Sequence, residues 1–167
     1  MLKRGKKAQT VFGMSFGMIF SIIIIIAILI VGFYVITFFL NLNKCTQVGL
    51  FFNDIEETVN EAWGNEISHE IFEGELPTSI KKVCIGNLSQ SASGFTDEQN
   101  LFLEDGYEIQ NNIFLIPPNK ACDGDLASFK LKHAKSDTFH CIDVIKGKVE
   151  IQYDITKADT IVTLSAP

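Results

Sequence analysis

A run of thirty residues near the N-terminus, from Val11 to Leu40, carries no charge. A bilayer core requires roughly 20 apolar residues at about 1.5 Å per residue, and a helix satisfies all its backbone hydrogen bonds within hydrocarbon. As a helix, this run is about 45 Å long, which exceeds the ~30 Å of hydrocarbon, so it must tilt or project from the membrane. The sequence therefore predicts a transmembrane helix at residues 11–40.

Charge is distributed unevenly on the two sides of this run. Of the 14 Lys and Arg residues, four precede it, whereas all 20 Asp and Glu residues follow it, so residues 41–167 carry 10 minus 20, or −10. Because basic residues stay in the cytoplasm, we expect residues 1–10 to be a cytoplasmic head and the C-terminal part to lie outside. The acidic part lacks the basic face that nucleic acid requires.

The helical pattern continues beyond the uncharged run. Apolar or small residues recur every three or four positions at Cys45, Val48, Phe52, Ile55, Val59 and Ala62. This spacing indicates an amphipathic stalk helix at residues 41–64, which Gly64 and Asn65 end. The polar residues 41–44 mark where the helix leaves the lipid. The side chains that we expect to be buried against the rest of the chain are Phe51, Phe52, Ile55, Val59 and Trp63.

Residues 65–167 predict an extracytoplasmic β-rich domain, because short β-prone runs alternate with turn residues. The predicted strands are residues 79–86, 112–116, 128–133, 139–145, 148–155 and 160–164. Lys146-Gly147 predicts a tight turn that joins the fourth and fifth strands in a hairpin. A short helical turn is expected within residues 97–106. The expected class is α+β, with the stalk helix packed on a small antiparallel sheet.

The chain has four cysteines, Cys45, Cys84, Cys122 and Cys141, and all follow the uncharged run. An even number on the outer side favours two disulfides. Zinc is the competing use, but the spacings of 39, 38 and 19 residues contain no C-x-x-C pair. Three connectivities are possible, and loop length favours Cys45–Cys84 with Cys122–Cys141.

The N-terminal region combines a basic head, the stretch Lys6-Lys7-Ala8-Gln9-Thr10 and the uncharged helix, and a distal β-domain follows it. In these features the chain resembles archaeal type IV pilin-like proteins and archaellins. The resemblance implies that a prepilin-type peptidase recognises Lys7, Ala8 and Gln9 and cuts between Ala8 and Gln9. The fifth mature residue would be Gly13, where bacterial pilins carry Glu, so the pattern departs from the bacterial one.

Three small residues, Gly13, Gly17 and Ser21, recur at intervals of four within the uncharged run. Such spacing allows close approach of two membrane helices, and it predicts a homo-oligomer or filament assembled through this helix. The alternative is that Gly and Ser are simply common in membrane helices.

Candidate chemistry is sparse elsewhere. The histidines His69, His133 and His140 lie in no catalytic or metal-binding motif, and Asp123-Gly124-Asp125 is read as a turn. Asn87-Leu88-Ser89 is an N-glycosylation sequon at the end of a predicted strand. We therefore expect no enzyme, no cofactor and no metal site.

Two functional hypotheses follow from these patterns. The first is a pilin-like, membrane-anchored surface protein with a structural or adhesive role, in which the chain crosses the cell membrane once and can form a filament. The alternative is an uncleaved single-pass membrane protein whose ectodomain binds a partner or supports a membrane complex.

Overall fold

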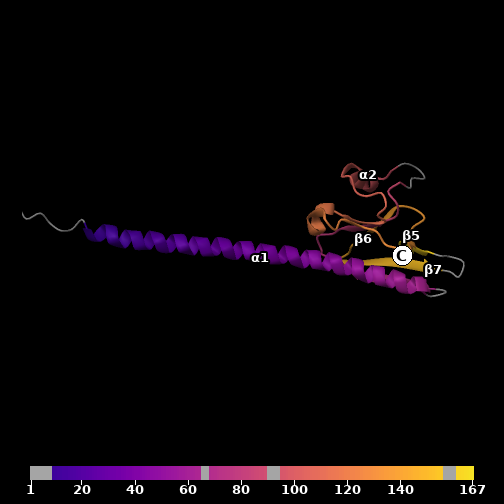
Figure 1. The fold of residues 1–167 in the computed structure, drawn as a ribbon, viewed down its shortest axis with the longest axis horizontal. Helices are drawn as coiled ribbons and strands as arrows, with labels where there is room; N and C mark the ends of the chain where they lie inside the picture. Colours follow the sequence, from indigo (N-terminus) through magenta and orange to yellow (C-terminus); the bar gives the residue numbers. More distant parts are fainter. Residues whose placement is uncertain (1–8, 65–67, 90–94, 156–160) are drawn as a thin grey trace, which may run out of the picture. The chain divides into compact units, whose positions relative to one another are not determined.

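The computed structural model of this chain describes residues 9–64, 68–89, 95–155 and 161–167 (Figure 1). It begins with one long helix, α1 (Gln9–Gly64), which ends where the sequence predicts. The chain separates into two compact units, one ending at Asn41 and the other spanning Leu42–Pro167. Both helix and antiparallel-rich sheet are present, so the expected α+β class is confirmed.

The strands form two four-stranded sheets, so the prediction of one small sheet is wrong. The first sheet contains, in spatial order, β1 (Ser68–Glu75), β7 (Lys148–Ile155), β8 (Val162–Ser165) and β5 (Ala134–Lys135). The second sheet contains β4 (Ser128–Phe129), β3 (Ile113–Ile116), β2 (Lys82–Ile85) and β6 (His140–Asp143). The pair β5–β8 is parallel, and the other pairs are antiparallel. Between β3 and β4 lie two short 3-10 helices, η1 (Pro118–Lys120) and η2 (Cys122–Gly124).

The C-terminal part of α1 contributes to the main hydrophobic core. Its buried apolar residues are Val48, Phe51, Phe52, Ile55, Val59 and Ala62. The ring of Phe51 lies 5.9 Å from that of Phe72 in β1, and the ring of Phe52 stacks at 4.8 Å on that of Phe129 in β4. Because residues from both sheets join this cluster, α1 supplies side chains to a core shared by the two sheets.

The expectation that Trp63 is buried is wrong, because 46% of it is exposed. Its ring stacks on the ring of His133 at a centroid distance of 3.8 Å. Ala62, one position earlier, completes the buried stripe three residues after Val59. A step of one residue turns about 100° around a helix, and this rotation moves Trp63 to the edge of the stripe.

Lys146 and Gly147 form the expected tight turn, but the prediction that the strands on either side of it pair as a hairpin is wrong. Ile145 and Lys148 exchange two backbone hydrogen bonds of 2.9 and 3.0 Å, and Lys146 and Gly147 both have positive φ. The pairing stops at this single bridge, because β6 pairs with β2 whereas β7 pairs with β1 and β8. The turn therefore carries the chain from one sheet to the other.

Two strands of the first sheet were not predicted. In β1, three Glu residues and Gly74 lower the intrinsic preference for a strand, yet all eight residues of β1 pair with β7. Strand β5, which pairs with β8, has only two residues and is therefore too short to be recognised from a sequence pattern. Tertiary pairing therefore outweighs local preference in both strands.

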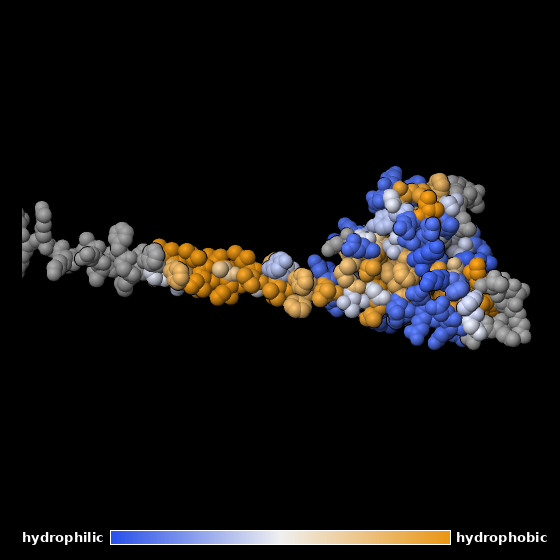
Figure 2. All heavy atoms as spheres, in the orientation of Figure 1, coloured by the Kyte–Doolittle hydropathy of each residue, from blue (hydrophilic) through white to orange (hydrophobic). Residues whose placement is uncertain are grey.

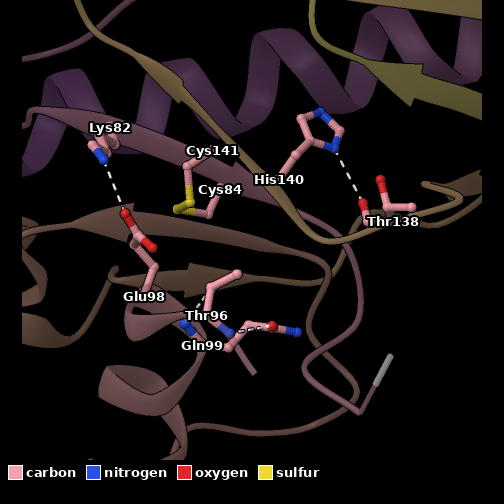
Figure 3. Close-up of a disulfide and its surroundings, with 8 residues drawn as sticks. All are labelled: Lys82, Cys84, Thr96, Glu98, Gln99, Thr138, His140 and Cys141. Atoms are coloured by element: carbon pink, nitrogen blue, oxygen red, sulfur yellow. Dashed lines mark hydrogen bonds and ion pairs between the residues drawn. A yellow bond between two sulfur atoms is a disulfide. The ribbon is translucent and has the colours of Figure 1, made fainter. Parts of the chain in front are cut away.

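A second, smaller cluster lies on the other face of the second sheet. It consists of the fully buried residues Cys84, Leu88, Phe102 and Phe114. Phe102 belongs to α2 (Asp97–Glu104), the expected short helix, and its ring lies 4.8 Å from that of Phe114. Thr96 and Gln99 form a capping box that fixes where α2 begins, as Figure 3 shows.

All four cysteines are paired, but in a connectivity other than the one that loop length favours. The disulfides join Cys45 to Cys122 and Cys84 to Cys141, across 77 and 57 residues. Cys84 and Cys141 are direct cross-strand partners in β2 and β6 (Figure 3). Strand register and the position of η2 therefore decide the pairing, and neither is visible in the cysteine spacing.

Gly74 allows α1 to pack closely on β1, and we expect Gly74→Ala to destabilise the domain. A Cβ at this position would lie 2.6 Å from Cε2 of Phe51 and 2.8 Å from Cε1 of Phe72. Phe51 is buried, so the clash costs about 1–3 kcal/mol of unfolding free energy. Chemical denaturation of the full chain measures it. The matched control is Gly49→Ala, because nothing lies within 4 Å of a Cβ there and helix propensity favours Ala by about 1 kcal/mol.

We expect peptide mapping under non-reducing conditions to recover Cys45 linked to Cys122 and Cys84 linked to Cys141. Replacing Cys45 and Cys122 together by Ser should lower the unfolding free energy by roughly 2–5 kcal/mol, because a long loop is no longer closed in the unfolded chain. Recovery of Cys45 linked to Cys84 would contradict the observed strand register.

Candidate functional site

The apolar half of α1 is the most unusual surface of the molecule. Among the residues that the structure describes, α1 is the one helix long and apolar enough to cross a membrane. Every large apolar side chain from Met18 to Leu40 is exposed, and together they form the continuous hydrophobic surface in Figure 2. Soluble proteins rarely expose an apolar surface of this extent, so this segment requires a partner or a lipid environment.

The hydroxyl of Thr37, in the apolar half of α1, is satisfied within the helix. The Thr37 hydroxyl donates to the backbone carbonyls of Phe33 and Tyr34, at 3.1 and 2.9 Å. An unsatisfied hydroxyl would cost several kcal/mol in hydrocarbon, whereas a hydroxyl bonded to its own helix is tolerated. The next exposed polar residues, Asn41, Asn43 and Lys44, coincide with the boundary between the two compact units.

The residues expected to guide processing and assembly lie at the start of α1. Lys7 and Ala8 fall outside the described residues, and Gln9 is the first residue of the helix. Gly13, Gly17 and Ser21 are all helical, so their spacing places them along one face. Nothing lies within 4 Å of a Cβ built at Gly17, so space for a neighbouring helix is present there.

The C-terminal half of α1 also has an acidic face. A shallow surface depression is lined by Asn53, Glu56, Glu57, Asn60 and Glu61. No Lys, Arg or His lines this depression, so its potential is negative and it repels anions. Glu56 is partly exposed and Glu57 is exposed.

The three histidines lie in β1, in the turn before β5 and in β6. His69 in β1 lies 3.7 Å from the carboxylate of Asp154, both largely exposed, whereas His133 stacks on Trp63. Nδ1 of His140 lies 3.1 Å from the carbonyl of Thr138 (Figure 3). Its Nε2 is buried and has no hydrogen-bond partner in the described part of the chain. The same part contains no group of three metal-ligating side chains.

Asn112 is a structurally important polar residue that the sequence reasoning missed. Its side-chain oxygen accepts a hydrogen bond from the backbone of Leu131 at 2.7 Å, and its amide donates to the carbonyls of Leu131 and Ala134. These bonds join the start of β3 to the segment that enters β5. The adjacent pair Asn111-Asn112 before a strand is the only sequence signal, and it also fits an ordinary turn.

An ion pair attaches α2 to the second sheet. Nζ of Lys82 in β2 donates to Oε1 of Glu98 at 2.9 Å (Figure 3). This hydrogen bond holds the pKa of Glu98 below its usual value of 4.5 and raises the pKa of Lys82 above 10.5. The stabilisation is therefore complete between these two values. It is lost as pH falls through the lowered pKa of Glu98 or rises through the raised pKa of Lys82.

We expect Glu98→Gln to cause a small loss of stability at neutral pH, since the charged hydrogen bond with Lys82 is weakened. The difference from the unaltered chain should shrink at a pH well below 4.5, where Glu98 is protonated in both states. Denaturant midpoints at the two pH values measure this. Glu104→Gln is the control, because Glu104 is exposed on the same helix and forms no ion pair with a described residue. A pH-independent difference would contradict the assignment.

Comparison of the chain with protein-family models, curated proteins and solved structures found no match. A functional assignment must therefore be built from the residues themselves. The strongest feature is the exposed apolar segment of α1, which runs in one helix into residues that belong to the core of a disulfide-bonded domain.

Proposed function

We propose that this chain is a pilin-like, membrane-anchored surface protein with a structural or adhesive role. The observation that carries the proposal is the change of environment along α1. From Met18 to Leu40 every large apolar side chain is exposed, whereas from Val48 to Ala62 a stripe of apolar side chains is buried in the domain core. Such a helix suits a lipid or helix-bundle environment at one end and a folded domain at the other.

The orientation in this proposal follows from charge and from the cysteines. The residues before the uncharged run that carry charge are all basic, which favours a cytoplasmic N-terminus. Two disulfides within the C-terminal domain are consistent with an oxidising, extracytoplasmic compartment. The domain carries −10, from 10 basic and 20 acidic residues, and is repelled by an anionic lipid surface.

Assembly into a filament is the further part of this proposal. Gly17 lies on an open helix surface, and its spacing with Gly13 and Ser21 permits close contact between copies of α1. Cleavage between Ala8 and Gln9 would leave a mature chain that begins at the first residue of α1. The entire apolar segment would then remain available for packing against other subunits.

The alternative function is an uncleaved single-pass protein whose domain binds a partner or supports a membrane complex. The acidic face of α1 favours it, because Glu56, Glu57 and Glu61 lie on the side of the helix away from the core. Identical acidic faces repel one another, so close packing of this half of α1 between copies would be unfavourable. This alternative predicts retention of the basic head and no filaments.

The mature N-terminus discriminates between the two functions. In a host with a prepilin-type peptidase, we expect mass spectrometry of the membrane-extracted chain to find Gln9 as the first residue. Lys7→Gln and Ala8→Leu should reduce cleavage, since both alter the matched motif, whereas Lys3→Gln outside it should not. An intact chain that starts at residue 1 in such a host would support the single-pass alternative.

A further inference from the structure

The sequon Asn87-Leu88-Ser89 adopts a defined local structure. Gly86, which precedes it, has a φ of 131° that side-chain-bearing residues rarely adopt, and it turns the chain away from β2. The backbone N–H and the hydroxyl of Ser89 both donate to Oδ1 of Asn87, at 2.9 and 2.8 Å. The two side chains that define the sequon are therefore already in direct contact in the folded domain.

The three side chains of the sequon point to different environments. Leu88 is fully buried in the cluster with Cys84, Phe102 and Phe114, so it fixes the segment to the domain. Ser89 is exposed and Asn87 is partly exposed. Both hydrogen bonds use Oδ1 as acceptor, and Nδ2 of Asn87 donates no hydrogen bond to a described residue. Among the described residues, a covalent bond at this amide nitrogen would break no hydrogen bond.

We propose that Asn87 is the attachment site of an N-linked glycan. The donor would be a lipid-linked sugar phosphate of the kind used by membrane-bound oligosaccharide transferases. Nδ2 forms a bond to the anomeric carbon of the sugar, the bond between that carbon and the phosphate oxygen breaks, and the lipid phosphate leaves with the electron pair. Nδ2 gives up one proton to the transferase. Ser89 supplies the hydroxyl that such sequons require.

The position of the site adds to this inference. Among all Asn residues in the chain, Asn87 is the one followed two positions later by Ser or Thr. Its turn lies beside α2, since Leu88 belongs to the same buried cluster as Phe102. The inference rests on the proposed orientation, because the sugar donor must meet the domain on the extracytoplasmic side.

The test is translation of the full chain in the presence of microsomal membranes that perform N-glycosylation. A second version carries an Asn-Gly-Thr sequon appended after Pro167, which reports orientation independently of Asn87. We expect the chain to gain one glycan that an endoglycosidase removes, and the extended version to gain two. Asn87→Gln and Ser89→Ala should each remove one glycan, whereas Ser89→Thr should retain it.

The possible outcomes separate the site from the orientation. A single glycan on the extended version that is insensitive to Asn87→Gln would overturn the site and leave the orientation supported. No glycan on either version would overturn both the orientation and the site. Two glycans on the extended version, one of them lost in Asn87→Gln, would support both. Non-reducing peptide mapping of the glycosylated chain should still show Cys84 linked to Cys141, since the glycan is attached outside the buried cluster.

Discussion

The structure depends on one helix whose apolar side chains are exposed in one half and buried in the other. Between Val48 and Ala62, α1 places six apolar side chains into a core that both sheets share. A four-stranded sheet with one apolar face needs a second layer to exclude water from that face. Here the same helix that supplies this layer also carries the exposed apolar segment.

The disulfides and polar contacts reinforce this arrangement at its ends. Cys45, one turn before Val48, binds Cys122 and attaches the start of the domain's helix to η2. The Cys84–Cys141 disulfide joins the central strand β2 to the edge strand β6, and Cys84 is part of the small cluster that contains Phe102 of α2. Asn112 attaches the segment before β5 to the start of β3, and the Lys82–Glu98 pair attaches α2 to β2. Strand pairing does not supply either of these connections. A domain of this size has a limited core, so the two disulfides add substantially to its stability, whereas the partly exposed ion pair contributes little.

Sequence reasoning recovered the elements with strong periodicity. The helix through Gly64, the stripe from Val48 to Ala62 and strand β7 were predictable, because their apolar residues repeat with the period of the element. Strand β1 and the cysteine connectivity were not, because both depend on partners distant in the chain. The candidate site divides in the same way: the apolar segment is evident from composition, whereas the contact between Asn87 and Ser89 requires a folded turn.

The most direct test of the central claim is a depth scan along α1 in lipid bilayers. Spin labels carried by a non-natural amino acid leave the four cysteines paired, and their collisions with oxygen and with a water-soluble relaxation agent report depth. We predict that labels from Gly17 to Leu40 collide with oxygen and are shielded from the water-soluble agent, with the change falling at residues 41–44. Labels at Glu57 and Glu61 should be accessible from water. Accessibility of the Gly17–Leu40 segment to the water-soluble agent throughout would contradict a membrane anchor.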